Sequence, residues 1–285
     1  MTPLEMPSRM AHVVLAATLA LAIPAAAWAQ QPAETGWVQL AQSQLRLVGG
    51  TNPSAPGERV LLLEMTLQPN WKTYWRMPGD AGIPPSFDWT GSTNIGNAEV
   101  RYPAPAMYVD QAGRTIGYKT AVVFPIVLKP EDPSKPSSVR VELAFGICRE
   151  ICIPVETKVS LDIPPNAALA SDKIADAMSK VPTRKSAKDA ARGPVAVSAI
   201  ELSGGIAAPK LSVKTAGVET LLVEAPDGLF VPIPQRVSGD DKSGTFEIDL
   251  AKSQDLPDLK GKILTITAIG KAGAVETVWT MPPSL

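Results

Sequence analysis

The chain has 285 residues, a formal net charge of -1, 28 prolines and only two cysteines. A charge this close to zero gives no electrostatic basis for binding nucleic acid or an anionic membrane surface. The length allows one large or two ordinary domains, and a chain of this size buries a hydrophobic core without disulfide staples. Frequent prolines favour short strands and turns over long helices.

The first residues have the pattern of an export signal. Arg9 and His12 precede an apolar run from Val13 to Ile23, and the small residues Ala27 and Ala29 mark a cleavage site. We expect residues 1–29 to be a signal peptide, because the apolar run is short for a retained membrane anchor. No later stretch reaches the roughly 20 apolar residues of a membrane helix. The mature chain is therefore expected to have no transmembrane segment and to reside in an oxidising compartment, the periplasm.

His12 is the only histidine of the sequence, so the expected mature chain has none. A Ser-His-Asp or Cys-His catalytic arrangement within the chain is thereby excluded. Zinc or copper sites built on histidine are excluded for the same reason.

Residues 36–165 contain short runs in which apolar and polar positions alternate. Leu45 and Leu47 share one face of a first strand, and the strongly apolar run Arg59–Leu67 is expected to be a central strand. Further short strands are expected at Phe87–Trp89, Glu99–Tyr102 and Ala121–Leu128. The last of these should lie at an edge or carry a bulge, because Pro125 has no N–H to donate. About seven such strands predict an all-β domain, an immunoglobulin-like antiparallel β-sandwich.

Two connecting segments of this domain carry further signals. Trp71, Tyr74 and Trp75 lie close together in the sequence, either to fill the core or to form a wall beside the cysteines. Pro103–Tyr118 is expected to be a loop with glycine turn points at Gly113 and Gly117.

The remainder of the chain divides into two parts. Residues 166–194 are expected to form a helix over Ser171–Val181, capped by Ser171, followed by a basic, solvated linker over Pro182–Pro194. Residues 195–285 return to β character and predict a second, smaller β-sandwich, in which we find no catalytic motif. Its expected strands are 208–213, 219–224, 244–250, 263–268 and 276–281.

Both cysteines lie at the tip of the clearest hairpin of the sequence. Val139–Phe145 and Val155–Ile163 each alternate with period two, and Cys148 and Cys152 fall in the segment that joins them. Such a tip is exposed, and it brings two Cα atoms within disulfide range. Arg149 between the cysteines favours a thiolate, whereas Glu150 opposes it.

The residues alone leave three hypotheses for the pair open. A structural disulfide is the commonest role for cysteines in exported proteins, although so small a ring adds only about 2 kcal/mol of stability. Two thiolates also bind a soft ion such as Cu(I), and Met77 and Met107 are candidate additional ligands. The third possibility is a redox-active dithiol that exchanges with partner proteins.

Three segments resemble a known family, in the same order along the chain: Asn70–Arg76, Gly117–Leu128 and Phe145–Lys158. They are similar to the periplasmic N-terminal domain of the thiol:disulfide interchange protein DsbD, and most of all to the longer ScsB-like variant associated with suppression of copper sensitivity. The resemblance covers residues 37–164. It implies an immunoglobulin-like domain, without a cofactor, that passes electrons to periplasmic thioredoxin-fold proteins.

The resemblance also implies roles for individual residues. Cys148 and Cys152 correspond to the redox pair, and Cys152 to the cysteine that forms mixed disulfides with partners. The segment Asp110–Gly117 resembles the cap that shields the disulfide. The residues expected to shield the site or contact partners are Tyr74, Tyr108, Gln111, Tyr118 and Arg149.

Some features depart from the family. The cysteine spacing is shorter than in the best-known members, and Gln111 stands where the cap has a phenylalanine. The chain has neither a transmembrane electron channel nor a thioredoxin domain, so thioredoxin-fold partners and the membrane electron donor are expected to be separate proteins.

We therefore predict a periplasmic thiol:disulfide interchange protein, an electron relay of the protein-disulfide reductase type, with no cofactor and no metal. Two alternatives remain open at this point. One is a non-catalytic β-sandwich binding module with a structural disulfide, and the other is a copper-stress accessory protein. The direction of electron flow and the role of the second sandwich are not indicated by the sequence.

Overall fold

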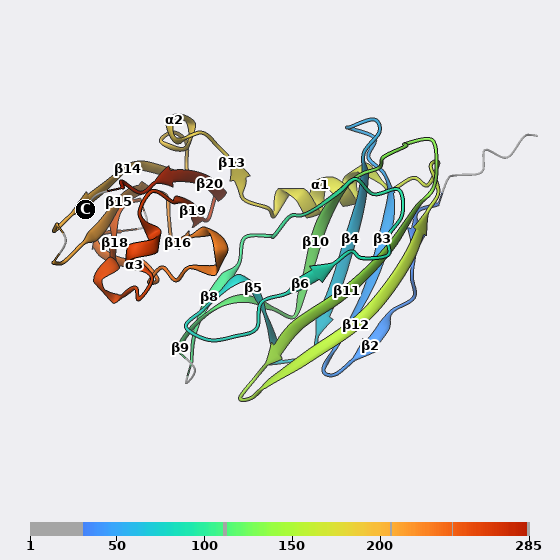
Figure 1. The fold of residues 1–285 in the computed structure, drawn as a ribbon, viewed down its shortest axis with the longest axis horizontal. Coiled ribbons are helices and arrows are strands. Elements are labelled where there is room, and N and C mark those ends of the chain that lie inside the picture. Colours follow the sequence, from blue (N-terminus) through green and yellow to red (C-terminus); the bar gives the residue numbers. More distant parts are fainter. Residues whose placement is uncertain (1–30, 111–112, 206, 241, 284–285) are drawn as a thin grey trace, which may run out of the picture.

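The computed structural model describes residues 31–110, 113–205, 207–240 and 242–283, most of which lie in β-strands. Figure 1 shows two groups of strands, and the chain passes from the first to the second after helix α1 (Ser171–Ser179). We call the first group, β1 to β12, the N-terminal sandwich and the second, β13 to β20, the C-terminal unit. The predicted all-β fold class, an antiparallel sandwich followed by further sheets, is confirmed. The predicted signal peptide, residues 1–29, lies outside the described residues.

The N-terminal sandwich consists of two sheets of six strands. One has the order β1-β3-β4-β10-β7 with β2 paired to β3, and the other β12-β11-β5-β9-β8 with β6 paired to β11. The strands are β1 (Ala33–Glu34), β2 (Val38–Leu40), β3 (Ser43–Thr51), β4 (Arg59–Leu67), β5 (Lys72–Gly79), β6 (Ser86–Asp88), β7 (Asn97–Val100), β8 (Ala106–Asp110), β9 (Gly113–Lys119), β10 (Ala121–Lys129), β11 (Ser137–Cys148) and β12 (Cys152–Ile163).

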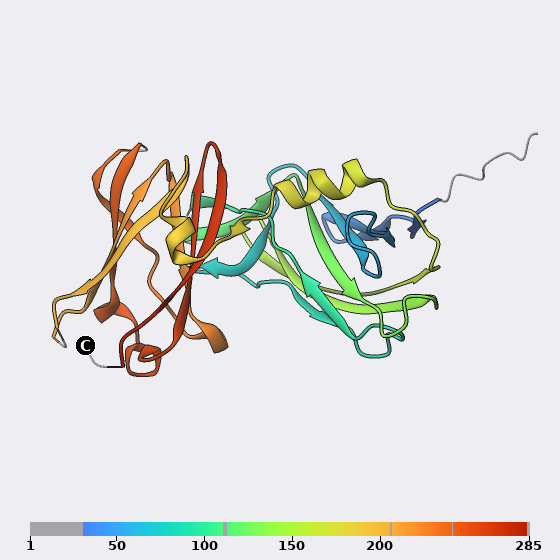
Figure 2. The same cartoon turned by 90° about the horizontal axis from the view of Figure 1, so that it is seen from above.

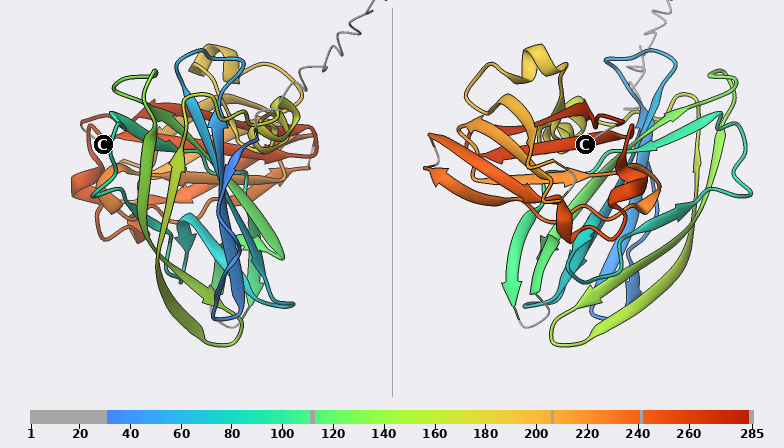
Figure 3. Two further views of the ribbon diagram at one scale, coloured as in Figure 1. Left: turned by 90° about the vertical axis from the view of Figure 1, so that its right-hand side faces the viewer. Right: turned by 60° about the vertical axis from the view of Figure 1, so that its left-hand side comes forward.

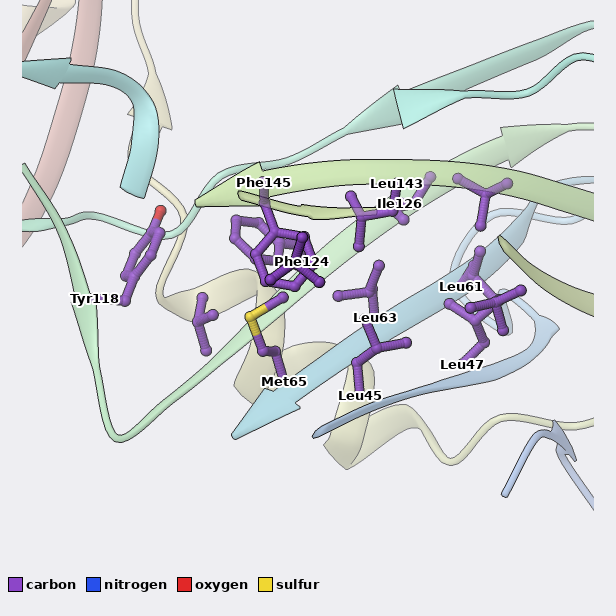
Figure 4. Close-up of a cluster of buried hydrophobic side chains, with 14 of the residues drawn as sticks. Leu45, Leu47, Leu61, Leu63, Met65, Tyr118, Phe124, Ile126, Leu143 and Phe145 are labelled. Carbon is purple, nitrogen blue, oxygen red and sulfur yellow. The ribbon is translucent and has the colours of Figure 1, made fainter. Parts of the chain in front are cut away.

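The core of the sandwich lies between these sheets (Figure 4). The predicted inward positions Leu45 and Leu47 are fully buried there, beside Leu61 and Leu63 of β4. β4 is apolar on both faces, because its alternate residues face a second cluster under α1. That cluster contains Val48, Val60, Leu62, Leu169, Ile174 and Ala177. The helix thus covers the outer face of the first sheet, and β4 is the central strand that the sequence predicted.

Four details of the N-terminal half differ from the sequence predictions. β10, with Pro125, was expected at an edge or with a bulge, but it lies between β4 and β7 without a register shift, because its pairing with β7 begins only at Ile126. Pro103–Tyr118, expected to be a loop, contains the hairpin of β8 and β9. Gly117 is not a turn residue: a Cβ there would lie 2.0 Å from the Thr73 oxygen, so glycine is needed for the close approach of β9 to β5. Ser171 does not cap α1, because the N-cap position is Ala170 and no side chain accepts a hydrogen bond there.

The C-terminal unit contains two four-stranded sheets, with the orders β13-β20-β19-β16 and β14-β15-β18-β17. One hydrophobic cluster with members from both sheets joins them. The elements are β13 (Thr183–Arg184), α2 (Ala187–Ala190), β14 (Ala196–Ser203), β15 (Lys210–Ala216), β16 (Thr220–Glu224), η1 (Pro226–Gly228), β17 (Gln235–Gly239), β18 (Ser243–Asp249), η2 (Leu250–Lys252), α3 (Leu256–Leu259), β19 (Ile263–Gly270) and β20 (Gly273–Thr280).

The segment expected to be a solvated linker, residues 182–194, packs against the C-terminal unit. β13 pairs in parallel with β20, and Ala190 of α2 is fully buried in the cluster of that unit. Ser186 caps α2 by accepting a hydrogen bond from the Asp189 N–H. The basic residues of the segment predicted a solvated linker, because charge alone does not indicate packing of this kind.

We predict that Gly117→Ala destabilises the protein by about 1–3 kcal/mol, the usual cost of overpacking. The added methyl group meets the Thr73 carbonyl oxygen, so β9 must move away from β5. Chemical denaturation of the full chain measures the change. Gly36→Ala is the matched control, because nothing lies within 4 Å of a Cβ there, and a shift within about 0.5 kcal/mol is expected. Equal stabilities of the two variants would contradict the close approach.

Candidate functional site

The two cysteines face each other across the end of the β11–β12 ladder. This ladder pairs residues in register from Ser137 with Ile163 to Cys148 with Cys152. The cysteines form a disulfide, and their Cα atoms lie 4.1 Å apart. The strand pairing therefore holds the two sulfurs together at the tip of the hairpin, as the sequence pattern predicted. Figure 3 shows this tip at the same end of the sandwich as the β8–β9 hairpin.

The two sides of the disulfide differ in exposure. Cys148 is only 2% exposed, because it lies on β11 next to β5, where its register partner is Lys72. Cys152 begins the edge strand β12 and is exposed. A thiolate attacks a disulfide sulfur along the line of the S–S bond, so access to each sulfur controls exchange. The Cys152 sulfur is therefore accessible to an attacking thiolate, whereas the Cys148 sulfur is buried.

Tyr74 of β5 contacts the exposed cysteine from the protein side. Its hydroxyl lies 3.4 Å from the Cys152 Sγ, and since a disulfide sulfur has no hydrogen, the hydroxyl is the donor. The side chain is 1% exposed. Its ring packs against the backbone of Gly82, where a Cβ would lie 2.3 Å from the ring. The structure thus places Tyr74 at the disulfide, where the sequence expected it.

Lys72 is a residue of the site that sequence reasoning missed. Its side chain is buried, and its Nζ donates a hydrogen bond of 2.8 Å to Thr115 Oγ1. The same Nζ lies 6.0 Å from the centre of the Tyr74 ring. Alternation in a strand places residues i and i+2 on one face, so Lys72 could have been expected on the Tyr74 face.

The contacts of two other predicted residues, Arg149 and Tyr108, are described by the structure. Arg149, at the exposed tip, lies 3.8 Å from Glu150 and 5.7 Å from the centre of the Trp71 ring. Tyr108 of β8 lies under Lys119, with the Nζ 4.2 Å from its ring centre, and burial raises the pKa of its hydroxyl. Gln111 lies outside the described residues.

Tyr118 does not fit the partner-contact role that the sequence suggested. It is 7% exposed and packs edge-on against Phe124 in the core. Its hydroxyl donates a hydrogen bond of 2.8 Å to the Pro103 oxygen, and burial raises its pKa well above the ordinary value. The position of Tyr118 beside the expected cap predicted a surface role, but its side chain lies on the inward face of β9.

Large apolar side chains are exposed on the tip and on the β8–β9 hairpin at the same end of the sandwich. Ile151, between the cysteines, is 69% exposed, and Val109 of the β8–β9 hairpin is 79% exposed. Ile83 is 38% exposed, and its carbonyl accepts a hydrogen bond from the Gly146 N–H of β11. We call Ile83, Val109 and Ile151 the apolar rim. Exposed apolar groups that gather at one place on a soluble protein mark an interaction surface.

The candidate metal ligands of the sequence do not gather at the cysteines. Met77 and Met107 pack against the hydrophobic core of the sandwich. Among the described residues, no group of three or more histidine, cysteine, aspartate or glutamate side chains is arranged to hold a metal ion. The described part of the chain also has no helix long and apolar enough to cross a membrane.

The fold and the site define a β-sandwich protein that presents one disulfide at a hairpin tip, with one cysteine exposed and the other buried. Residues 50–164 match the family model described as "Thiol:disulfide interchange protein DsbD, N-terminal". This region of the chain is therefore similar to the DsbD N-terminal domain family, as the resemblance of its sequence motifs predicted.

A solved structure extends the likeness beyond this region. It is described as the crystal structure of the N-terminal periplasmic domain of ScsB from Proteus mirabilis, with a TM-score of 0.67 and 24% sequence identity. The match covers 88% of this chain and 99% of that chain, so both the N-terminal sandwich and the C-terminal unit share its fold. No curated protein matches the sequence.

We predict that the two cysteines of the reduced protein react at different rates. Iodoacetamide should modify Cys152 faster than Cys148 by about tenfold or more, because the thiolate is the nucleophile and its reactivity depends on access. Mass spectrometry of peptides from a time course, repeated on Cys148→Ser and Cys152→Ser, assigns the two rates. Equal rates in the folded protein would contradict the asymmetry in burial.

Tyr74→Phe should raise the pKa of the Cys152 thiol in the reduced protein by about one unit. A hydrogen bond to a charged acceptor contributes about 1.5–3 kcal/mol, and its loss disfavours the thiolate. The ultraviolet absorbance of the thiolate, followed against pH, gives the value. Tyr118→Phe is the control, because its hydroxyl bonds to Pro103 and not to sulfur. A Tyr74→Phe thiol with the wild-type pKa would show that the contact is without influence.

Proposed function

We propose that this protein is a periplasmic thiol:disulfide interchange protein that carries two electrons between partner proteins through Cys148 and Cys152. The observation that supports this most is the unequal exposure of the pair at the tip of a domain similar to the DsbD family. A staple between strands needs neither an exposed sulfur nor a hydrogen-bond donor aimed at it. The solved relative is described as a periplasmic domain, which agrees with the export signal expected over residues 1–29.

The exchange proceeds in two displacements. In the dithiol form, the Cys152 thiolate attacks one sulfur of a partner disulfide, and a mixed disulfide forms while the other partner sulfur leaves as a thiolate. The Cys148 thiolate then attacks the Cys152 Sγ, and the first partner sulfur leaves. Two electrons and two protons pass to the partner, and the Cys148–Cys152 disulfide forms. The reverse sequence, with a donor thiolate attacking Cys152, restores the dithiol.

The groups behind Cys152 favour its thiolate. The Tyr74 hydroxyl is positioned to donate a hydrogen bond to the charge that forms on the sulfur. Lys72 places a basic side chain beside the Tyr74 ring. A more stable thiolate favours the dithiol form, so these contacts raise the reduction potential of the pair and make the disulfide easier to reduce.

The apolar rim suits a thioredoxin-fold partner. Mixed-disulfide chemistry requires the partner sulfur to approach Cys152 directly, and the rim offers apolar contact around that point. The electron donor then has a reactive thiol that reaches the periplasm. Met77 and Met107 are partly buried and pack against the core, which does not favour the copper alternative.

The reduction potential of the Cys148–Cys152 pair tests this proposal. Equilibration of the purified protein with glutathione and then with thioredoxin should give a value between about -180 and -270 mV, the range of exchangeable dithiols. The Cys148→Ser, Cys152→Ser double variant must lose all exchange. A potential below about -300 mV would identify a structural staple and leave a binding module as the function.

Ile151→Ser combined with Val109→Ser should slow the reaction with a reduced thioredoxin-fold protein by about tenfold, equivalent to 1.4 kcal/mol. The rate with dithiothreitol, which needs no docking surface, should stay at the wild-type value. Stopped-flow measurement with both reductants separates these effects. Val237→Ser, on an exposed residue of the C-terminal unit, is the matched control. A rim variant as fast as the control with the protein reductant would refute the docking role.

A further inference from the structure

Strand β5 runs from the disulfide to the C-terminal unit. Its first residues pair on both sides: Lys72 and Thr73 with β11, and Lys72 to Tyr74 with β9. The pairing with β9 then shifts, from Tyr74 opposite Gly117 to Gly79 opposite Thr115. The residues between Tyr74 and Gly79 therefore depart from the regular ladder, and side-chain contacts add to the backbone pairing at the two ends of this stretch. Figure 2 shows β5 reaching towards the C-terminal unit.

Arg76 provides the main polar contact in this stretch. Its guanidinium donates two bonds of 2.8 and 2.9 Å to the two carboxylate oxygens of Glu224 and one of 2.5 Å to Glu276. Both glutamates belong to the C-terminal unit, on β16 and β20. The same guanidinium lies 4.3 Å from the centre of the Trp75 ring. This two-pronged pairing fixes the direction of the arginine as well as its position.

The surroundings of this ion pair are largely removed from water. The side chains of Arg76, Glu224 and Glu276 are 26%, 15% and 11% exposed. Burial lowers the pKa of Arg76, but the two carboxylates outweigh it and raise that pKa, whereas burial raises the pKa of Glu224. Partly buried charges of this kind hold their geometry more firmly than surface pairs.

Apolar contacts join the two units at the same place. Leu222 and Ile233 of the C-terminal unit are buried in the hydrophobic cluster of the N-terminal sandwich. A further ion pair lies beside them, in which Arg184 contacts both Glu276 and Glu99 of β7, at 3.1 and 2.7 Å. The units therefore share a continuous packed interface, and the C-terminal unit is held against β5.

We propose that Arg76 is a positioning residue for the redox site, through which the docked C-terminal unit holds Tyr74 against Cys152; this rests on the function proposed above. Tyr74 pairs with Gly117 at the end of the regular ladder, and the Arg76 ion pair lies two residues further on, before β5 pairs again at Gly79. Loss of the ion pair lets this stretch of the strand shift. The Tyr74 hydroxyl then moves from the sulfur, and the thiolate loses its donor.

The first test compares Arg76→Met with the wild-type full chain. The equilibrium constant with glutathione should shift about tenfold towards the disulfide, equivalent to about 30 mV. The pKa of the Cys152 thiol should rise with it, as in Tyr74→Phe. Glu247→Gln, which breaks the 2.8 Å ion pair with Lys210 inside the C-terminal unit, is the matched control and should shift neither quantity.

A double-mutant cycle separates positioning from general stability. If Arg76 acts through Tyr74, Arg76→Met should shift the equilibrium constant by less than about twofold in a Tyr74→Phe background, since coupled residues are not additive. Additive shifts in the cycle would overturn the inference, because Arg76 would then act by another route. A folded Arg76→Met protein with the wild-type potential would overturn it as well.

Arg76→Lys guards against a failure of Arg76→Met to fold. It keeps the charge but lacks the fork that engages both carboxylates, so a shift in the same direction of about threefold is expected. An unchanged constant would refute the positioning role. The wild-type protein distinguishes this result from a failure of the proposed function. If no thioredoxin-fold protein reduces the wild-type disulfide, the proposed function is wrong. If the disulfide is exchangeable but insensitive to Arg76, only the positioning role of Arg76 is wrong.

Discussion

The antiparallel ladder between β11 and β12 runs without a register shift from the base of the hairpin to the two cysteines. Register in such a ladder is set by the alternation of buried and exposed side chains, because a slip of one residue would turn the whole apolar face to solvent. The core positions Val141, Leu143 and Phe145 therefore also fix where Cys148 and Cys152 meet. The chemistry of the tip depends on a constraint that lies in the core.

The same alternation explains what could be predicted from the sequence. Period-two runs gave β4 with the correct bounds and placed the cysteines opposite each other on a hairpin. Lys72 was missed because its burial depends on Thr115, a residue 43 positions away that packing brings close. Tyr118 was assigned to the surface because a position beside an expected loop says nothing about which face of a strand it occupies. A glycine such as Gly117 can indicate either a turn or a close approach of two strands, and only the position of the neighbouring strand decides between them.

Segments rich in charge were also difficult to place. Residues 182–194 have basic side chains and prolines typical of a linker, yet β13 and α2 within them pack on the C-terminal unit. A long side chain can cover apolar surface while its charge pairs with a partner. Arg184 pairs with both Glu99 and Glu276, two residues that the sequence gives no reason to associate. The composition of a segment indicates how polar it is on average. Which charged residues pair across an interface depends on the fold.

The C-terminal unit has no evident chemistry of its own, but its position gives it a physical connection to the redox pair. A disulfide at the end of a hairpin would by itself be controlled only by the two strands that carry it. Here a third strand, β5, supplies Lys72 and Tyr74 from behind, and part of that strand departs from the regular ladder. Tyr74 is the last residue of the regular ladder, and the stretch that follows it is further restricted by contacts of Arg76 with groups outside the sheet. The carboxylates of Glu224 and Glu276 are these groups, so a second unit beside the sandwich is consistent with a site whose reactivity depends on the exact position of one hydroxyl.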